Sequence, residues 1–225
     1  MTTGKAPLWV RAGRVYREKG ASGVWFGALS LVGYRRLVLL AVRLDAPAPV
    51  WQARVDAEIR PLLPADEAAF EALGQGDARV FRERLALGHQ PWGAWSAGAL
   101  RHVVWVGVGS AWVEYLRCQV SLGVGVAYAY RAYTEPPYRG LGLGPATQSA
   151  CLAALRADGF VASLAGVLPD NPWAFAPWLK VGYARIGVVR AFGAGRRPLV
   201  AATFRRGAGL RTGFRFERAL RGAPA

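Results

Sequence analysis

The sequence predicts one α/β (α+β) domain in which a mixed central sheet is flanked by helices. Residues 55–60 alternate apolar and charged side chains, as expected of a half-buried strand. Helix signals follow at 64–67 and at 77–87, and a further helix is expected over 145–157, where Gly159 suits a C-terminal cap. Several short strands come between these helices, and the chain then reads helix, strand, helix, strand. The hydrophobic content of 53% is enough to bury a sizeable core.

The net charge of +15 is concentrated at the two ends of the chain. Residues 1–45 carry a net +6 and residues 190–225 a net +8, whereas the middle is nearly neutral. We therefore expect the ends, and not the central fold, to attract anionic surfaces. The predicted organisation is a basic and apolar extension over 1–50, a domain over 51–195 and a basic extension over 196–225.

The N-terminal segment 8–44 mixes apolar and basic residues. Its longest stretch without charge, 21–34, has 14 residues, short of the roughly 20 that span a bilayer. We expect a helix packed on the domain or on a partner, with an amphipathic helix at a membrane surface as the alternative. The first residues lack the pattern of a signal peptide, which predicts a cytoplasmic protein, with peripheral attachment to a membrane left open.

The two cysteines and two histidines do not have the spacing of a metal site. Cys118 and Cys151 are expected to be reduced core thiols, and no metal is predicted. In the strand predicted over 100–108, His102 alternates as a surface residue, although it is also a candidate base. Glu135 precedes two prolines and is expected to be a turn residue.

The segment 133–145 has the most informative pattern, because a strand runs through a glycine-rich turn into a helix. Glycines let the backbone approach a ligand, and the first turn of a helix leaves its N–H groups unpaired. Those groups and the helix dipole favour an anion such as a pyrophosphate. Pro145 fits the first turn. An ordinary tight turn is the alternative interpretation. A dinucleotide-binding fingerprint is disfavoured, because the turn comes late in the chain.

The turn residues 139–144, Arg-Gly-Leu-Gly-Leu-Gly, resemble the coenzyme A signature of the GNAT acetyltransferase superfamily. Downstream, Asn171-Pro172-Trp173-Ala174 and 178–183 resemble that family's second conserved block. Arg60 with Asp66 is similar to its opening strand and helix. The resemblance covers roughly residues 53–195 and implies a mixed, splayed sheet.

The resemblance also implies acetyl-CoA, or another acyl-CoA, as the acyl donor and an amine as the acceptor. The end of the motif strand would line the thioester, residues 139–146 would hold the pyrophosphate, and Asn171 would lie near the pantetheine arm. Trp178 occupies the place where many relatives use a tyrosine to protonate the leaving thiolate. The cofactor-binding residues implied in this way are Ala132, Tyr133, Thr134, Arg139, Gly140, Leu141, Gly142, Leu143, Gly144, Ala146, Asn171 and Trp178.

This sequence departs from the family at both usual catalytic groups. The motif strand has Tyr128 where many relatives have a glutamate base. An indole such as that of Trp178 donates a hydrogen bond but is a poor acid, and Pro177 beside it is expected to disturb a helix interior. Glu114, in the strand predicted over 111–120, is a candidate base, with an outward-facing strand residue as the alternative. Tyr128 and Tyr130 are candidates to line the acceptor site, although an aromatic stripe is also typical of a core.

The resemblance therefore favours an acyl-CoA-dependent N-acyltransferase acting on a small amine, an amino sugar, a peptide or a protein. The alternative is a weakly active or inactive GNAT-like subunit that docks into a larger assembly, or onto an anionic surface, through the basic ends 1–45 and 190–225. A protein partner or an anionic membrane suits these ends. Nucleic acid is less favoured, because the tail has few aromatic residues between its arginines.

Overall fold

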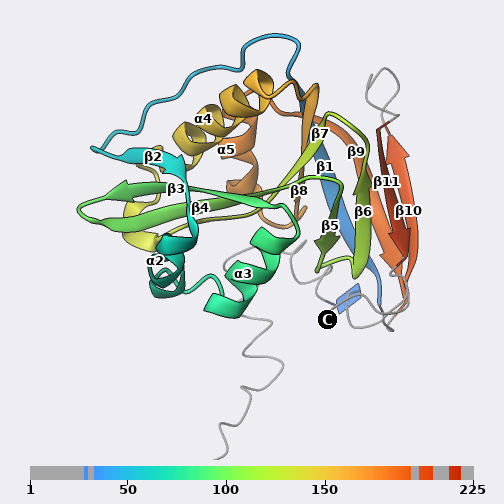
Figure 1. Ribbon diagram of the computed structural model, residues 1–225. Coiled ribbons are helices and arrows are strands. Elements are labelled where there is room, and N and C mark those ends of the chain that lie inside the picture. The colour runs from blue at the N-terminus through green and yellow to red at the C-terminus, as the bar shows by residue number, and fades with distance from the viewer. Residues whose placement is uncertain (1–27, 30–32, 194–197, 205–212, 219–225) are drawn as a thin grey trace, which may run out of the picture.

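The computed structural model describes residues 28–29, 33–193, 198–204 and 213–218. Its main feature is an eight-stranded sheet in the order β10-β9-β1-β8-β7-β4-β3-β2, beside a three-stranded sheet in the order β11-β6-β5 (Figure 1). The strands of the large sheet are β1 (Arg35–Arg43), β2 (Glu58–Pro61), β3 (Gln90–Ser96), β4 (Ala99–Gly107), β7 (Val126–Thr134), β8 (Ala162–Val167), β9 (Ala184–Phe192) and β10 (Leu199–Phe204). The small sheet contains β5 (Ser110–Val113), β6 (Cys118–Leu122) and β11 (Phe214–Arg218).

Helices cover both faces of the large sheet. On one face, α4 (Leu143–Ala157) and α5 (Phe175–Lys180) pack on apolar residues of β1, β4, β7 and β8. On the other face, α2 (Glu67–Ala72) and α3 (Ala78–Ala86) bury Phe70 and Phe81 against Trp105. The small sheet covers the rest of that second face, over β1, β8 and β9 (Figure 1). The mixed sheet flanked by helices that the sequence predicted is therefore confirmed.

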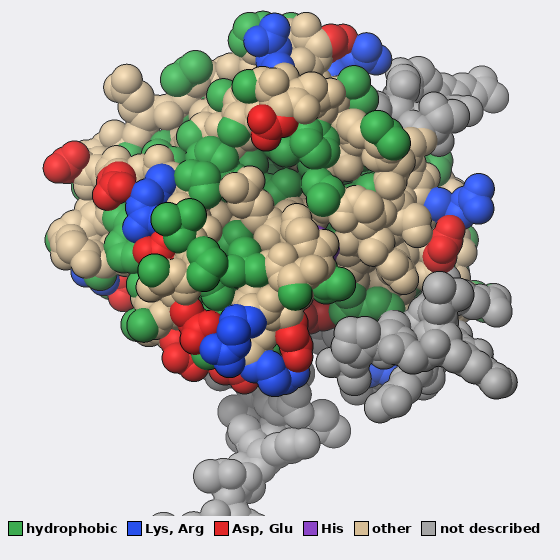
Figure 2. Space-filling view, viewed as in Figure 1, with side chains coloured by type: hydrophobic (Ala, Val, Ile, Leu, Met, Phe, Trp, Pro, Cys, Tyr) green, Lys and Arg blue, Asp and Glu red, His purple; other side chains and the backbone are tan. Residues whose placement is uncertain are grey.

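Helix α3 and the end of α4 lie where the sequence predicted, whereas α4 begins at Leu143, two residues before the predicted start. The Asp77 carboxylate caps α3 by accepting a hydrogen bond from the Val80 amide at 2.8 Å. Helix α4 stops at Gly159, whose φ of 81° is left-handed, and the Phe160 amide bonds back to the Leu155 carbonyl at 2.9 Å. On the outer surface of α3, ion pairs join Arg79 to Glu83 and Arg82 to Glu67, and Figure 2 shows charged side chains of both signs gathered there.

The prediction of a helix for 8–44 is wrong for residues 35–43. These form β1, which pairs antiparallel with both β8 and β9 and so lies inside the sheet. Leu39 and Leu40 point to opposite faces and are both fully buried, so the apolar run that resembled a helix belongs to a strand buried on both sides. The predicted boundary at residue 50 therefore separates β1 from the sheet to which it belongs. Most of segment 8–34 lies outside the described residues.

The C-terminal region also contributes strands that the sequence did not predict. β10 pairs with β9, and β11 pairs with β6. Both lie within the predicted extension 196–225, so this part of the chain is not simply an appended tail. Between β1 and β2, the chain runs along α4 (Figure 1), where the Ser149 hydroxyl donates to the Pro49 carbonyl and accepts from the Trp51 amide.

No helix in the described ranges combines the length and the apolar character needed to cross a membrane. Cys118 and Cys151 are free, buried thiols in different core clusters, and burial raises the pKa of each to about 12. Both are core residues, as predicted. Among the described residues, no group of three His, Cys, Asp or Glu side chains is placed to hold a metal ion.

Candidate active site

The two parallel strands β7 and β8 separate part-way along their length. They pair from Val126 with Ala162 as far as Ala129 with Ala165, and beyond that point β7 pairs only with β4, while β8 pairs only with β1. Unpaired backbone edges therefore face each other across a widening gap. Such edges can hydrogen-bond an extended, amide-bearing chain.

A bulge shapes the β7 side of this gap. Val103 pairs with Tyr133 and Trp105 with Tyr130, so Arg131 and Ala132 together oppose one residue of β4. Arg131 has a φ of 52°, which few residues other than glycine adopt. The bulge divides the residues predicted to line the thioester. Ala132 is exposed, and the Thr134 hydroxyl bonds to His102 on the face of the sheet that α4 covers. Tyr133 packs on the opposite face, against the apolar cluster beneath α2 and α3.

The glycine-rich bend joins β7 to α4 and has unpaired amides. The N–H groups of Gly140, Leu141 and Gly142 donate no hydrogen bond to another described residue. Gly140 has a φ of 78° and Gly142, the N-cap of α4, a φ of 84°. The segment between β1 and β2 covers one side of the bend, since its Arg54 amide donates to the Leu141 carbonyl at 2.8 Å. The exposed edge of the bend is therefore at Gly140, with Arg139 beside it.

The inner part of the same motif is buried. Leu143, Gly144 and Ala146 lie under the bend, and Gly144 faces the ring of His102 and Pro177 of α5. These buried residues pack the first turn of α4 against the rest of the domain. The Arg139 guanidinium donates from Nε to the Thr134 carbonyl at 3.1 Å and lies over Tyr133, so a cation is held at the mouth of the bend.

The prediction that His102 is a surface residue is wrong. It is 2% exposed, its Nδ1 shares a hydrogen bond of 2.8 Å with the Thr134 hydroxyl, and burial lowers its pKa to about 4. Its Nε2 has no partner among the described residues. Because β4 is covered on both faces, alternation does not identify a solvent side there. Glu135 is a turn residue, as predicted, and accepts a hydrogen bond from Arg101 at 2.6 Å.

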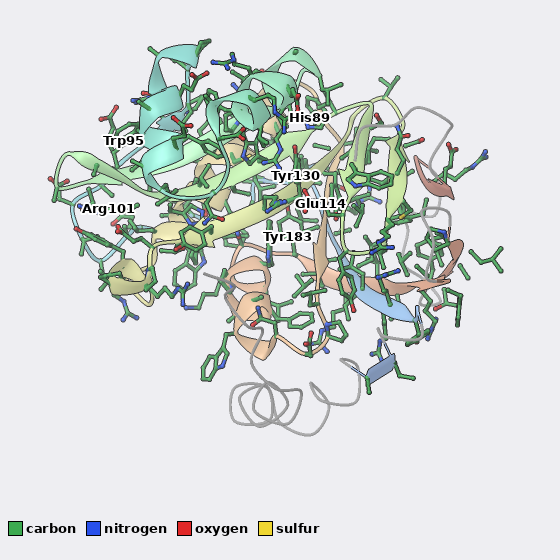
Figure 3. The ribbon with its side chains drawn as sticks, turned by 90° about the horizontal axis from the view of Figure 1, so that it is seen from below. His89, Trp95, Arg101, Glu114, Tyr130 and Tyr183 are labelled. Atoms are coloured by element: carbon green, nitrogen blue, oxygen red, sulfur yellow. The ribbon has the colours of Figure 1, made fainter. Side chains whose placement is uncertain are left out.

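The three candidate catalytic residues lie near one another but in different surroundings. Tyr128 is 3% exposed within the core, and burial raises its pKa well above the usual range. Glu114 follows the end of β5, in the turn before β6, because the strand predicted over 111–120 is in fact a hairpin. Its exposed carboxylate forms an ion pair with Arg131. Tyr130 is half-buried and bonds to His89 at 2.6 Å, a residue that the sequence did not single out (Figure 3).

The segment that begins at Asn171 forms the turn before α5 and the helix itself. Asn171 is half-buried, and its carbonyl accepts from the Ala174 amide. Trp178 is 6% exposed and packs edge-on against Tyr183, so its ring belongs to the core. The expectation that Pro177 disturbs a helix interior is wrong, because α5 begins at Phe175 and Pro177 lies in its first turn, where a missing N–H costs little.

No family model and no curated protein matches this sequence. Solved structures do match its fold. A GCN5-related N-acetyltransferase from Sphaerobacter thermophilus aligns with a TM-score of 0.53 and 13% identity over 83% of this chain and 57% of its own. A protein assigned to the GNAT family from Novosphingobium aromaticivorans aligns with a TM-score of 0.50 and 19% identity over 70% and 65%.

A third match is the GCN5-related glucosamine N-acetyltransferase region of a fungal multi-domain beta-N-acetylglucosaminidase, with a TM-score of 0.51 and 15% identity. It covers 76% of this chain and 22% of that protein. The chain thus spans less than two thirds of the length of each of these three proteins. The fold is that of the GNAT acetyltransferases.

Proposed function

We propose that this protein is an acyl-CoA-dependent N-acyltransferase that binds its acyl-CoA in the gap between β7 and β8. One observation carries the proposal: the gap leads to the glycine bend, whose amides at Gly140, Leu141 and Gly142 have no partner among the described residues. Unpaired amides at a helix N-terminus are a favourable seat for a pyrophosphate. The fold shared with acetyltransferases supports the same assignment.

In this proposal each part of the site has a separate task. The pyrophosphate lies on the exposed amides of the bend, with Arg139 near its charge, and the pantetheine arm follows Ala132 and Thr134 towards the bulge. Asn171 lies at the facing turn. Leu143, Gly144 and Ala146 support the bend from below, and Trp178 supports α5 from inside the core. Acetyl-CoA is the simplest donor that fits, and the acceptor is an amine.

Titration calorimetry with two variants at one position tests the pyrophosphate site. Asparagine tolerates the left-handed conformation of Gly142 better than most residues, and aspartate has the same shape but a negative charge. The β-carbon of either variant lies about 3.3 Å from the Gln52 carbonyl, so both strain the bend equally. We expect Gly142→Asn to weaken acetyl-CoA binding moderately and Gly142→Asp to abolish it. Equal affinities for the two variants would contradict a pyrophosphate at the bend.

A second candidate function is that of a subunit that binds acyl-CoA without transferring the acyl group. The observation that favours it is the burial of Tyr128 and Trp178, the residues at the two usual catalytic positions. Release of free thiol from acetyl-CoA in the presence of amines separates the two candidates, since only a transferase produces it. Docking through the basic ends also remains a proposal, because most of residues 1–32 and 205–225 lie outside the described part of the chain.

A further inference from the structure

A chain of hydrogen bonds runs from the small sheet to β7 through His89. His89 Nε2 lies 2.9 Å from the Ser110 carbonyl oxygen, and His89 Nδ1 lies 2.6 Å from the Tyr130 hydroxyl. A carbonyl oxygen only accepts, so Nε2 carries the hydrogen of the neutral ring. Nδ1 is then an acceptor, and the Tyr130 hydroxyl donates to it. The phenol oxygen keeps its lone pairs for another donor.

Local structure fixes the position of the His89 ring. Gly88 ends α3 in a left-handed conformation, and the His89 amide bonds back to the Arg84 carbonyl at 3.0 Å. The ring lies over Gly107 of β4, where an added β-carbon would be 3.2 Å from His89 Nε2. His89 is 5% exposed. A histidine seated this firmly can hold Tyr130 in one orientation.

The charges around the pair keep the imidazole neutral. Burial, together with the nearby Arg84, lowers the pKa of His89, while the Ser110 carbonyl acts in the opposite direction. The pKa of Tyr130 is raised to about 12, chiefly by burial; Arg84 and Arg131 oppose the rise, and Glu114 adds to it. The Arg84 guanidinium lies over the Tyr130 ring at 5.6 Å. The imidazole is therefore neutral at pH 7 and presents its Nδ1 lone pair to the Tyr130 hydroxyl, and the two arginines favour negative charge on the phenol oxygen.

Tyr130 lies next to the point where the gap opens. It is the residue directly before the Arg131 bulge, and the last paired residue of β7 towards β8 is Ala129. The ring of Tyr128 stacks on the ring of Tyr130 at a centroid distance of 6.0 Å. The Tyr128 hydroxyl lies next to Gly166 of β8, so this side chain fills the space where the two strands begin to separate. Figure 3 shows His89, Tyr130 and Glu114 together, with Trp95 and Arg101 farther along the sheet.

We propose that Tyr130 is the catalytic residue that takes the proton of the attacking amine, and that His89 is the positioning residue that accepts the proton of Tyr130. This inference rests on the proposed acyltransferase function. As the amine nitrogen bonds to the thioester carbon, its proton moves to the Tyr130 oxygen and the phenol proton moves to His89 Nδ1. The carbon–sulfur bond breaks, the thiolate leaves, and the proton returns through Tyr130 to the sulfur. The products are an amide and a free thiol, with no change of oxidation state.

Two conservative variants separate this role from a structural one. His89→Asn keeps an acceptor near the Nδ1 position but cannot bind a proton, and Tyr130→Phe keeps the ring and removes the hydroxyl. Tyr34→Phe, on the far side of the sheet against Phe192, is the control. Thiol release from acetyl-CoA is measured across the pH range with spermidine, glucosamine and an amino-terminal alanine peptide as probe amines. Calorimetry measures acetyl-CoA binding in parallel.

We expect both variants to bind acetyl-CoA as the wild type does and to transfer the acyl group roughly 100-fold more slowly. The double variant is expected to be no slower than either single variant, because the two residues act as a unit. Rates are expressed per neutral amine, because the probe amines are themselves protonated at low pH. The remaining acidic limb of the wild-type profile, which reflects protonation of His89 below the usual imidazole pKa of 6.5, is expected to disappear in His89→Asn. Histidine nitrogen NMR is expected to show the Nε2–H tautomer of His89 in the full-length protein.

Turnover in Tyr130→Phe equal to that of the wild type, an unchanged acidic limb in His89→Asn, or an Nδ1–H tautomer would each overturn the relay. Acetyl-CoA binding without transfer to any probe amine would also count against it. Absence of acetyl-CoA binding in the wild type would instead refute the proposed function, and the NMR tautomer would then still decide whether the hydrogen-bond chain exists.

Discussion

The Tyr128 hydroxyl lies 2.7 Å from the point where a β-carbon on Gly166 would stand. The two residues belong to the neighbouring parallel strands β7 and β8, just where those strands begin to separate. A tyrosine on one strand therefore requires a glycine on the other. The ring of Tyr128 fills the space where the two strands begin to separate. We infer that it forms the closed end of the proposed acyl-CoA site.

Replacing Gly166 with alanine is expected to lower the free energy of unfolding by about 1–3 kcal/mol, a typical cost of overpacking. The added methyl group would collide with Leu37 as well as with Tyr128. Denaturant unfolding measures the loss. Gly144→Ala is the control, because its β-carbon would meet His102 at an ordinary 3.5 Å within a helix, where alanine is favoured. A Gly166→Ala protein as stable as the control would show that this space is loosely packed.

A second prediction follows from the position of β1 inside the sheet, and it concerns folding. Leu40→Asp places a charge at a fully buried position between β8 and β9, and we expect it to prevent folding, since an unpaired buried charge costs several kcal/mol. Arg43→Asp, at the exposed end of the same strand, is expected to remain folded. Circular dichroism and thermal melting separate the outcomes. A cooperative melt for Leu40→Asp near that of the wild type would place residues 35–43 outside the core.

Burial of His102 predicts that stability depends on pH. Its pKa falls from 6.5 to about 4 on folding because burial disfavours the charged ring. Between these values the unfolded chain binds more protons than the folded one, so the free energy of unfolding decreases as the pH falls through this window. The expected loss is on the order of 3 kcal/mol. His89, whose pKa is also lowered, contributes in the same direction.

Denaturant unfolding at several pH values, for the wild type and for His102→Asn, tests this dependence. Asparagine places a polar atom near the Thr134 hydroxyl but does not titrate. The variant is expected to be less stable at neutral pH and to lose less stability on acidification. Parallel curves for the two proteins would indicate that another group dominates the acid response.

The local elements of this fold could be predicted from the sequence because their signals are local. Asp77 and Gly88 mark the ends of α3, and Gly159 marks the end of α4. The bend at Gly140–Gly144 was found in the same way. The three-dimensional partners of these elements were not predictable, as β1 demonstrates. A run of apolar residues buried on both faces has no alternation, and only its pairing with β8 and β9 distinguishes it from a helix.

The glycine-rich bend of the candidate site could be located from the sequence, but the buried polar residues beside it could not. His89 follows a helix cap in the sequence, with no motif around it, and its partners Ser110 and Tyr130 are 21 and 41 residues away. The sequence placed Glu114 within a strand because the four-residue turn between β5 and β6 does not interrupt the apolar pattern around it. Tyr130 was found among the candidates, although alternation could not separate it from the core residue Tyr128.

Amide NMR of the full-length protein during titration with acetyl-CoA tests the central claim most directly, because it observes the backbone groups themselves. The account predicts that the amides of Gly140, Leu141 and Gly142 shift most, followed by those of Ala132 and Thr134. In Gly142→Asp, the amides of Gly140 and Leu141 are expected not to shift when acetyl-CoA is added. Shifts confined to other regions, or no shifts at saturating acetyl-CoA, would contradict the assignment of the bend as a pyrophosphate site.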